Sequence, residues 1–287
     1  MAKNDLPIYN IEDFNSETEF YCNALPSHLK EHHFIHSPHK HDFFMVVLFT
    51  HGSGIHEIDF ISYKITPGTI FMLRPGQTHN WKLSPDIDGY IFFHSKDFYN
   101  SSSISQKIQD YPFFNSIHNP PIIKLKSKSQ EKLASLFIEI KKEYKEENLF
   151  KFQKLHTLTT LAYIELTRSY QRPATVKSTL YQLKVKQLED LIDKHYKTLK
   201  YPHQYADMMA ISEKHLNRIC RSCLNKTTTD LITDRVILEA KRSLTHTKLS
   251  INQIAESIGY EDASYFSRLF KKRAGETALS FMKKNRH

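Results

Sequence analysis

The chain has 287 residues, 40% of them hydrophobic and 25% charged, a composition typical of a globular protein with room for two domains. It has no apolar run near the ~20 residues of a membrane-spanning helix, no apolar signal-peptide core and only three cysteines. We therefore expect a cytoplasmic protein with no membrane partner and no disulfide framework. The net charge of +9 lies mainly in the last third, where 20 Lys and Arg stand against 12 Asp and Glu from residue 180 onward. This imbalance favours a polyanionic partner for that part of the chain.

The first predicted elements are short β-strands between residues 42 and 94. The run FFMVVLF at 43–49 is rich in aromatic and β-branched residues, and turns containing glycine or proline follow at 51–54 and 75–76. Several short strands separated by such turns predict a small β-sandwich or β-barrel.

Histidines gather around these strands. His39 and His41 precede the first strand, and His79 begins a later one. Convergent imidazoles can hold zinc, iron or copper, can line a ligand pocket, or can be hydrogen-bonded within the fold. The residues alone leave these three interpretations open. We expect His51 and His56 to lie on the surface.

From about Gln130 the apolar residues recur at helical spacing, which predicts two amphipathic helices within 130–168. Their apolar faces could pack on the strand domain or pair with a second subunit, and we expect a dimerising role. The candidate contact residues of the first helix are Leu133, Leu136, Phe137, Ile140 and Tyr144. The following stretch contains Pro, Ser and Thr without periodicity, so we assign residues 171–182 to an interdomain linker.

The segment 250–272, SINQIAESIGYEDASYFSRLFKK, has the features of a helix-turn-helix unit. Ser250 can cap a first helix, Gly259 can end it in the left-handed conformation, and Asp262 can cap a second helix. That second helix has a core face around Phe266 and a basic outer face around Arg268. This arrangement is typical of a helix that enters the major groove of DNA.

An earlier segment, YPHQYADMMAISEKHLNRICRS at 201–222, repeats this organisation, with Ser212 as a cap and Arg218 placed fifty residues before Arg268. Between the two units, apolar residues recur every four positions from Ile232 to Leu244, which predicts one connecting helix. Such a helix spans about 25 Å. It can hold two recognition helices on one face of the duplex at roughly one DNA turn, ~34 Å.

The C-terminal segment from RVILEAKRSL to SYFSRLFKKRAGETALSF resembles the signature of the AraC/XylS family of bacterial transcription regulators. The matching positions are Arg235, Ala240, Leu244, Ile254, Ala255, Gly259, Ser264, Tyr265, Phe266, Ser267, Arg268, Phe270, Lys271 and Gly275. Two positions depart from the family pattern: Ala278 stands where proline is usual, and Asn225 stands where glycine is frequent. These departures put the local loop geometry in doubt.

The resemblance implies a C-terminal domain whose two helix-turn-helix units bind successive major grooves. Arginine is suited to paired hydrogen bonds with guanine, and basic residues in general give salt-sensitive affinity for phosphates. The DNA-binding residues that we assign are Lys214, Asn217, Arg218, Arg221, Ala263, Ser264, Ser267, Arg268, Lys271 and Lys272.

The resemblance also implies an N-terminal cupin-like β-barrel that senses a small molecule and is followed by dimerising helices. Metal-holding cupins have a glutamate four or five residues after the His-x-His pair, but Met45 and Val46 occupy that place here. The missing carboxylate favours an effector pocket, although a three-nitrogen metal site remains the alternative. The candidate pocket residues are His39, His41, His79, Arg74, Phe43, Phe71 and Trp81.

We therefore predict a two-domain α+β protein, with a cupin-like sensing and dimerisation domain at 1–170 and an AraC-type DNA-binding domain at 183–287. Its helix-turn-helix units are expected at about 202–223 and 251–273, joined by a helix at about 228–245. The predicted function is sequence-specific transcription regulation by an effector-controlled homodimer, without enzymatic activity, cofactor or resident metal. The predicted partners are double-stranded DNA, a small molecule of unknown identity and RNA polymerase. The alternative function is a cupin metalloprotein or metalloenzyme domain fused to a DNA-binding module.

Overall fold

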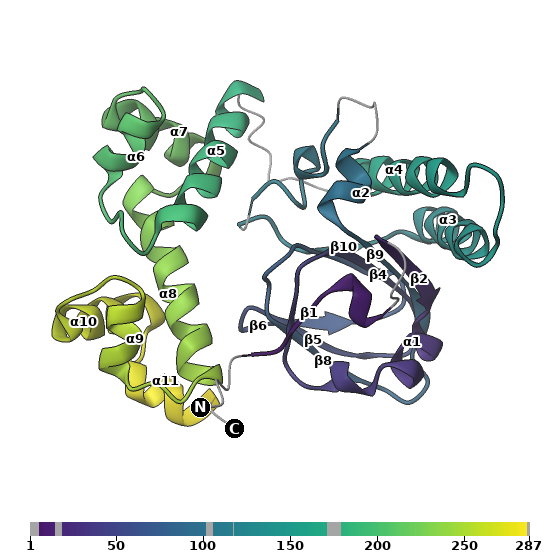
Figure 1. Cartoon of the computed structure of the whole chain (residues 1–287), viewed down its shortest axis with the longest axis horizontal. Coiled ribbons are helices and arrows are strands. Elements are labelled where there is room, and N and C mark those ends of the chain that lie inside the picture. The colour runs from purple at the N-terminus through teal and green to yellow at the C-terminus, as the bar shows by residue number, and fades with distance from the viewer. Residues whose placement is uncertain (1–5, 15–18, 102–105, 117, 171–178, 286–287) are drawn as a thin grey trace. The chain divides into compact units, whose positions relative to one another are not determined.

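The chain divides into two compact units, one ending at residue 171 and one beginning at residue 172. The first combines strands with helices, whereas the described part of the second is helical. This finding confirms the predicted two-domain α+β organisation. The computed structural model (Figure 1) describes residues 6–14, 19–101, 106–116, 118–170 and 179–285.

The N-terminal unit contains two antiparallel sheets. The larger has the strand order β10-β7-β4-β9-β2, the smaller has the order β6-β5-β8, and β1 pairs with β3 in parallel. Its strands and helices are β1 (Ile8–Tyr9), β2 (Phe20–Ala24), α1 (Leu25–Glu31), β3 (Lys40–His41), β4 (Phe44–His51), β5 (Gly54–Ile58), β6 (Ile61–Ile65), β7 (Thr69–Leu73), β8 (His79–Leu83), β9 (Asp88–His94), α2 (Lys96–Asn100), β10 (Ile122–Lys124), α3 (Ser127–Lys145) and α4 (Lys151–Ser169).

The predicted sandwich or barrel is, among the described residues, a pair of facing sheets that do not close into one ring of strands. Among the described residues, the short strands β5, β6 and β8 pair with one another and not with the edge strands β10 and β2 of the larger sheet. The small sheet therefore covers one face of the large sheet without completing a continuous strand ladder.

Strand β4 explains the long apolar run in the sequence. Val46 and Leu48 belong to a core shared with the helices, whereas Met45, Val47 and Phe49 belong to a core between the two sheets. Because successive side chains of a strand point to opposite faces, a strand buried on both faces must be apolar at every position. The larger sheet is thus the middle layer of the unit.

Helices α3 and α4 lie side by side against the large sheet (Figure 1). The five residues assigned above to a dimer contact belong to this packing: four are at most 8% exposed, and Tyr144 is half-buried against both cores. We therefore correct their role to core packing, because the apolar face of α3 is covered by the sheet of its own chain. The residues concerned are Leu133, Leu136, Phe137, Ile140 and Tyr144.

The C-terminal unit is arranged around α8, which contacts the helices before and after it. α7 and α10 lie toward its two ends (Figure 1). Its helices are α5 (Thr179–His195), α6 (Pro202–Met208), α7 (Glu213–Leu224), α8 (Thr228–His246), α9 (Ile251–Ser257), α10 (Ala263–Ala274) and α11 (Ala278–Asn285).

Helix α5 begins inside the segment 171–182 that was predicted to be a linker. Residues 171–178 of the predicted linker lie outside the described residues, but 179–182 are already helical. Leu, Gln and Lys after Thr179 are good helix formers, which is why the helix extends back to this point. Arg235 of α8 holds α5 in place: its Nε donates to Asp193 at 2.6 Å, and its guanidinium lies 4.2 Å from the ring centre of Tyr196.

The caps predicted for the helix-turn-helix units are confirmed. The side chains of Ser212, Ser250 and Asp262 accept hydrogen bonds from backbone N–H groups in the first turns of α7, α9 and α10. Such bonds satisfy donors that have no partner inside a helix. Asn225, one of the two departures noted above, ends α7 with φ of 53°. Asparagine tolerates this left-handed conformation better than most residues, so the local turn is kept.

None of the described helices combines the length and the apolar character that crossing a membrane requires.

Candidate nucleic-acid interface and effector site

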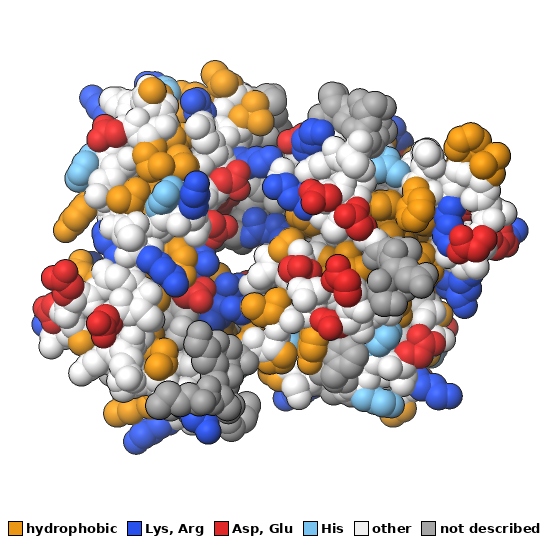
Figure 2. Space-filling view, in the orientation of Figure 1, with side chains coloured by type: hydrophobic (Ala, Val, Ile, Leu, Met, Phe, Trp, Pro, Cys, Tyr) orange, Lys and Arg blue, Asp and Glu red, His pale blue; other side chains and the backbone are white. Residues whose placement is uncertain are grey.

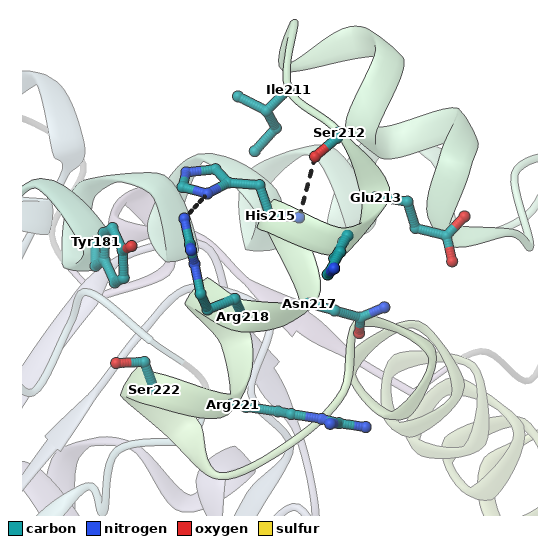
Figure 3. Close-up of a pocket in the computed structure, with 10 residues that line it drawn as sticks. Tyr181, Ile211, Ser212, Glu213, His215, Asn217, Arg218, Arg221 and Ser222 are labelled. Atoms are coloured by element: carbon teal, nitrogen blue, oxygen red, sulfur yellow. Dashed lines mark hydrogen bonds between the residues drawn. The ribbon is translucent and has the colours of Figure 1, made fainter.

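The outer face of α7 carries cations. Lys214, Arg218 and Arg221 are exposed and border an open groove (Figure 3), while Leu216 and Ile219 on the opposite face are buried. The helix is therefore fixed by its apolar side and presents positive charge to the solvent, as a recognition helix must.

Asn217 also forms a hydrogen bond within the protein. It is half-buried, and its Oδ1 accepts a hydrogen bond of 2.9 Å from the backbone N–H of Thr228, at the start of α8. A paired contact with adenine needs both the oxygen and the amino group of an asparagine. Because Oδ1 already accepts one hydrogen bond inside the protein, a paired contact of Asn217 with adenine would have to use its second lone pair.

Arg218 is held by His215, which Tyr181 contacts in turn, and the sequence analysis singled out neither of these two residues. Its Nη2 donates to Nδ1 of His215 at 2.5 Å, and the ring of Tyr181 from α5 meets the His215 ring edge-on, with centroids 5.9 Å apart and an interplanar angle of 87°. Figure 3 shows Arg218 reaching the His215 ring beside Tyr181. The spacing of His215 and Arg218, three residues apart on one helix, was the available signal.

The outer face of α10 is similar. Ser264, Arg268, Lys271 and Lys272 are exposed, and Nη2 of Arg268 lies 4.0 Å from the carboxylate of Asp262. Of the other assigned residues, Ala263 and Ser267 are half-buried, and the Ser267 hydroxyl donates to the Ala263 carbonyl at 2.8 Å.

Tyr265 is a further exposed residue of α10 that the sequence analysis did not assign to DNA, with 51% of its surface accessible. Arg273 has a different role, because it forms an ion pair with Asp230 of α8. Of the three basic residues in the last turn of α10, Lys271 and Lys272 stay exposed on the outer face, whereas Arg273 is engaged with α8.

In the N-terminal unit, six of the seven assigned pocket residues come together between the sheets. The centroid of the His79 ring lies 4.3 Å from that of His39, 5.1 Å from that of His41 and 5.5 Å from that of Trp81. Phe43 stacks on His41 at 4.4 Å.

His56 belongs to the same cluster, so its expected surface position was wrong. It is fully buried, its Nε2 lies 3.0 Å from Nδ1 of His79, and its ring is 4.5 Å from that of Phe71. The signal was Ile58, which is two positions later and therefore on the same face of β5. His51, by contrast, is exposed and pairs with Asp86 at 3.2 Å.

The clustered imidazoles are neutral. Burial lowers the pKa of His41 to about 3 and holds the pKa values of His56 and His79 well below the ordinary value, since a charge is costly away from water. In the described structure, Nε2 of His41, Nδ1 of His56, Nε2 of His79 and Nε1 of Trp81 are buried without hydrogen-bond partners. Orphaned polar atoms of this kind cost free energy, and a bound molecule that satisfied them would regain it.

A cavity of about 350 Å³ lies beside this cluster, with Trp81 on its wall. Its other lining residues, which the sequence analysis did not identify, are Pro26, Leu29, Ile35, Leu83, Ser84, Pro85 and Ile87. Arg74 follows β7, is half-buried, and donates its backbone N–H to Gln77 at 2.8 Å. It is the one assigned pocket residue that the ring contacts do not join to the cluster.

The described residues include no group of three or more His, Cys, Asp or Glu side chains placed to hold a metal ion. Met45, at one of the two positions where a cupin carboxylate would stand, lies in the apolar core between the sheets.

Comparison with known proteins covers both units. A family model described as an AraC-like ligand binding domain matches residues 26–157, and a model of a helix-turn-helix domain matches residues 205–284. The HTH-type transcriptional activator RhaR of Enterobacter sp. (strain 638) is 22% identical over 282 residues, covering 94% of this chain and 96% of RhaR. RhaS of the same strain is 24% identical over 239 residues, covering 82% and 83%.

Solved structures are similar as well. A crystal structure of an apo ToxT variant from Vibrio cholerae has 14% identity, covers 94% of this chain and 98% of its own, and gives a TM-score of 0.43. The C-terminal domain of AraT, a response regulator from Geobacillus stearothermophilus, has 27% identity, covers 36% and 87%, and gives a TM-score of 0.35.

Proposed function

This chain belongs to the AraC family of transcription regulators, and we propose that it reads DNA with the outer faces of α7 and α10. It is a DNA-binding regulator with a ligand-binding N-terminal domain. The observation that carries the proposal is the pair of exposed arginines, Arg218 and Arg268, at equivalent places on two capped helices.

The two faces divide the work of recognition. Arg218 and Arg268 lie where a helix in the major groove meets base edges, and each can make paired hydrogen bonds to guanine. Lys214, Lys271 and Lys272 are exposed beside them and would neutralise phosphates, which gives affinity that falls with salt.

Replacing Arg268 with alanine should cost about 1–3 kcal/mol of discrimination at one base position. Lys271→Ala, three residues after Arg268 on the same helix, is the matched control: it should weaken binding to all sequences alike and reduce the salt slope by about 1. The measurement is competition binding of the full chain to a duplex selected from a randomised library and to its single-base variants. Wild-type discrimination by Arg268→Ala would sink the assignment of α10.

For the N-terminal unit we infer that an effector occupies the cavity beside Trp81 and reaches from there toward the orphaned imidazole nitrogens, which lie behind Trp81 and not on the cavity wall. The wall is apolar except for Ser84 and Trp81, and a mostly apolar wall is typical of a small-molecule site. Because His41, His56 and His79 are neutral, they suit uncharged hydroxyl groups, which both donate and accept. Occupancy would favour one of two arrangements of the chain and so change its affinity for DNA.

A molecule that enters this cavity should change the fluorescence of Trp81, the one tryptophan of the chain. Leu29→Phe fills part of the cavity. It should raise the ligand concentration needed for half of the fluorescence change by about tenfold or more. Ile61→Phe, at an exposed position of the same sandwich, should leave it unchanged. Screening hydroxylated metabolites by fluorescence checks this expectation, and equal responses of the two variants would place the ligand elsewhere.

We infer that a homodimer uses the end of the α3–α4 hairpin and not the buried face of α3. Figure 2 shows hydrophobic side chains gathered at this end, where Leu149 is 85%, Phe150 66% and Phe152 54% exposed. Adjacent exposed apolar side chains of this size are typical of a protein contact. Sedimentation velocity of the full chain tests this contact: Phe150→Glu should shift the homodimer toward the monomer.

The relatives are transcription regulators, and we infer that this chain likewise has no enzymatic activity. A stoichiometric transition metal in protein purified without an affinity tag, lost in His41→Ala, would instead favour the metalloenzyme alternative. RNA polymerase stays a predicted partner.

A further inference from the structure

The side chain that the proposed function places against a base in the first unit is not free in the absence of DNA. Arg218 donates from Nη2 to Nδ1 of His215 at 2.5 Å. A guanidinium can only donate, so Nδ1 of His215 must be the bare, accepting nitrogen.

His215 is itself oriented by a different helix. The Tyr181 ring, from the first turn of α5, meets it edge-on at 5.9 Å, a favoured arrangement of aromatic rings. Tyr181 and His215 line the same groove as Lys214, Arg218 and Arg221. The three side chains thus form a continuous series, from Tyr181 to His215 to Arg218, which ends at the surface proposed to face DNA.

The second helix-turn-helix, which contains α10, shows no such series among its described contacts. The position equivalent to His215 is Tyr265, whose ring stacks on Tyr260 at 5.9 Å and 25°. Arg268 approaches the Asp262 carboxylate at 4.0 Å, and both side chains are more than 60% exposed. The two recognition helices therefore differ in how firmly they hold the equivalent arginine.

We propose that His215 is a positioning residue for DNA recognition, which, supported by Tyr181, holds Arg218 in the orientation in which it reads its base. This inference rests on the proposed base contact of Arg218. A free arginine loses side-chain entropy when it is fixed on a base. A side chain already fixed in the unbound protein loses less, so His215 makes base discrimination at this position sharper.

Two substitutions of His215 distinguish the role of its acceptor atom from the role of its aromatic ring. In His215→Asn, Oδ1 stands close to the place of Nδ1 and can still accept from Arg218. In His215→Phe, the ring that Tyr181 contacts is kept but the acceptor is lost. Arg218→Ala serves as the reference for complete loss of the base contact, and thermal unfolding of each variant confirms that it folds.

The experiment uses the full chain and a duplex selected from a randomised library, with every single-base variant as competitor. We expect Arg218→Ala to lose roughly 10- to 100-fold in discrimination at one position, and His215→Phe to lose roughly 3- to 10-fold at that same position. His215→Asn should stay within twofold of the wild type, and positions read by α10 should not change. Tyr181→Ala should show a smaller loss at the same position as His215→Phe.

Three outcomes would overturn the inference, and they can be told apart. If Arg218→Ala keeps full discrimination, the proposed base contact fails and the role of His215 fails with it. If Arg218→Ala loses discrimination but His215→Phe does not, only the positioning role is refuted. If His215→Asn loses as much as His215→Phe, the acceptor atom is not the cause.

Discussion

Lowering the pH from 7 to 5 should destabilise the N-terminal unit by about 6 kcal/mol or more. Burial lowers the pKa values of His28 and His41 to about 3 and that of His94 to about 4, and those of His56 and His79 fall as well. In the unfolded chain these imidazoles bind protons near pH 6.5. Below that pH the unfolded state therefore binds more protons than the folded state, so the free energy of unfolding falls as the pH falls.

Between pH 7 and pH 5, each such histidine contributes about 2 kcal/mol, so the three with stated values account for about 6 kcal/mol. That amount is comparable to the whole stability of a typical domain, about 5–15 kcal/mol. Urea titrations at pH 7, 6 and 5, followed by the fluorescence of Trp81, measure the effect on this unit alone. The free energy of unfolding should depend on pH between pH 6.5 and the lowered pKa values. Above pH 7 these histidines should cause no further change.

A single substitution tests one of the groups responsible. His94→Gln removes one buried imidazole, whose nitrogens contact Tyr163 and the Ser95 carbonyl, and should reduce the loss between pH 7 and pH 5 by about 2 kcal/mol. A loss in His94→Gln equal to that of the wild type would show that His94 is not among the groups responsible. A free energy of unfolding that is equal at pH 7 and pH 5 would contradict the prediction.

Gly259→Ala should destabilise the C-terminal unit by about 3–4 kcal/mol and abolish specific DNA binding. Gly259 has φ of +83°, and a Cβ placed there would lie 1.7 Å from the carbonyl oxygen of Lys197. This oxygen belongs to the backbone of the turn after α5, so no side-chain rotation can relieve the overlap. Lys200 reinforces the approach, since its ammonium donates to the carbonyl of Ile258 at 2.6 Å.

Gly275→Ala is the control for this substitution. Gly275 has nearly the same backbone conformation, with φ of +80°, but a Cβ there would meet nothing within 4 Å. Gly275→Ala should lower the free energy of unfolding by about 1 kcal/mol, because only the positive φ, and no steric overlap, opposes the alanine. Unfolding followed by far-ultraviolet circular dichroism compares the two, and equal destabilisation would show that the close approach to Lys197 is unimportant.

The helix-turn-helix units could be predicted from the sequence because their signals are local. A cap at Ser250 or Asp262 and a glycine at 259 act within one or two turns of chain, and such residues mark helix ends directly. The first helix-turn-helix lacks one of these signals, because Ala210 takes φ of 51° in the turn after α6, where no glycine marks the turn.

Local signals do not predict which surface covers the apolar face of a helix. The periodicity of α3 shows that Leu133 and Phe137 must be covered, but not whether their own sheet or a second subunit covers them. Likewise, alternation in the strands gave the sandwich, whereas closure into a barrel depends on which distant edges pair. The burial of His56 follows from the two-residue period of β5, which places it on the same face as Ile58.

Tyr181 is the third residue of α5, and residues 171–178, which join the two units, precede it directly. The end turn of a helix is its least cooperative part and opens at low free-energy cost. If this turn frays, His215 loses its aromatic support, and the guanidinium of Arg218 gains rotational freedom. Opening of this turn would therefore change the entropy of base recognition, and with it the affinity for DNA, while the backbone of α7 stayed where it is.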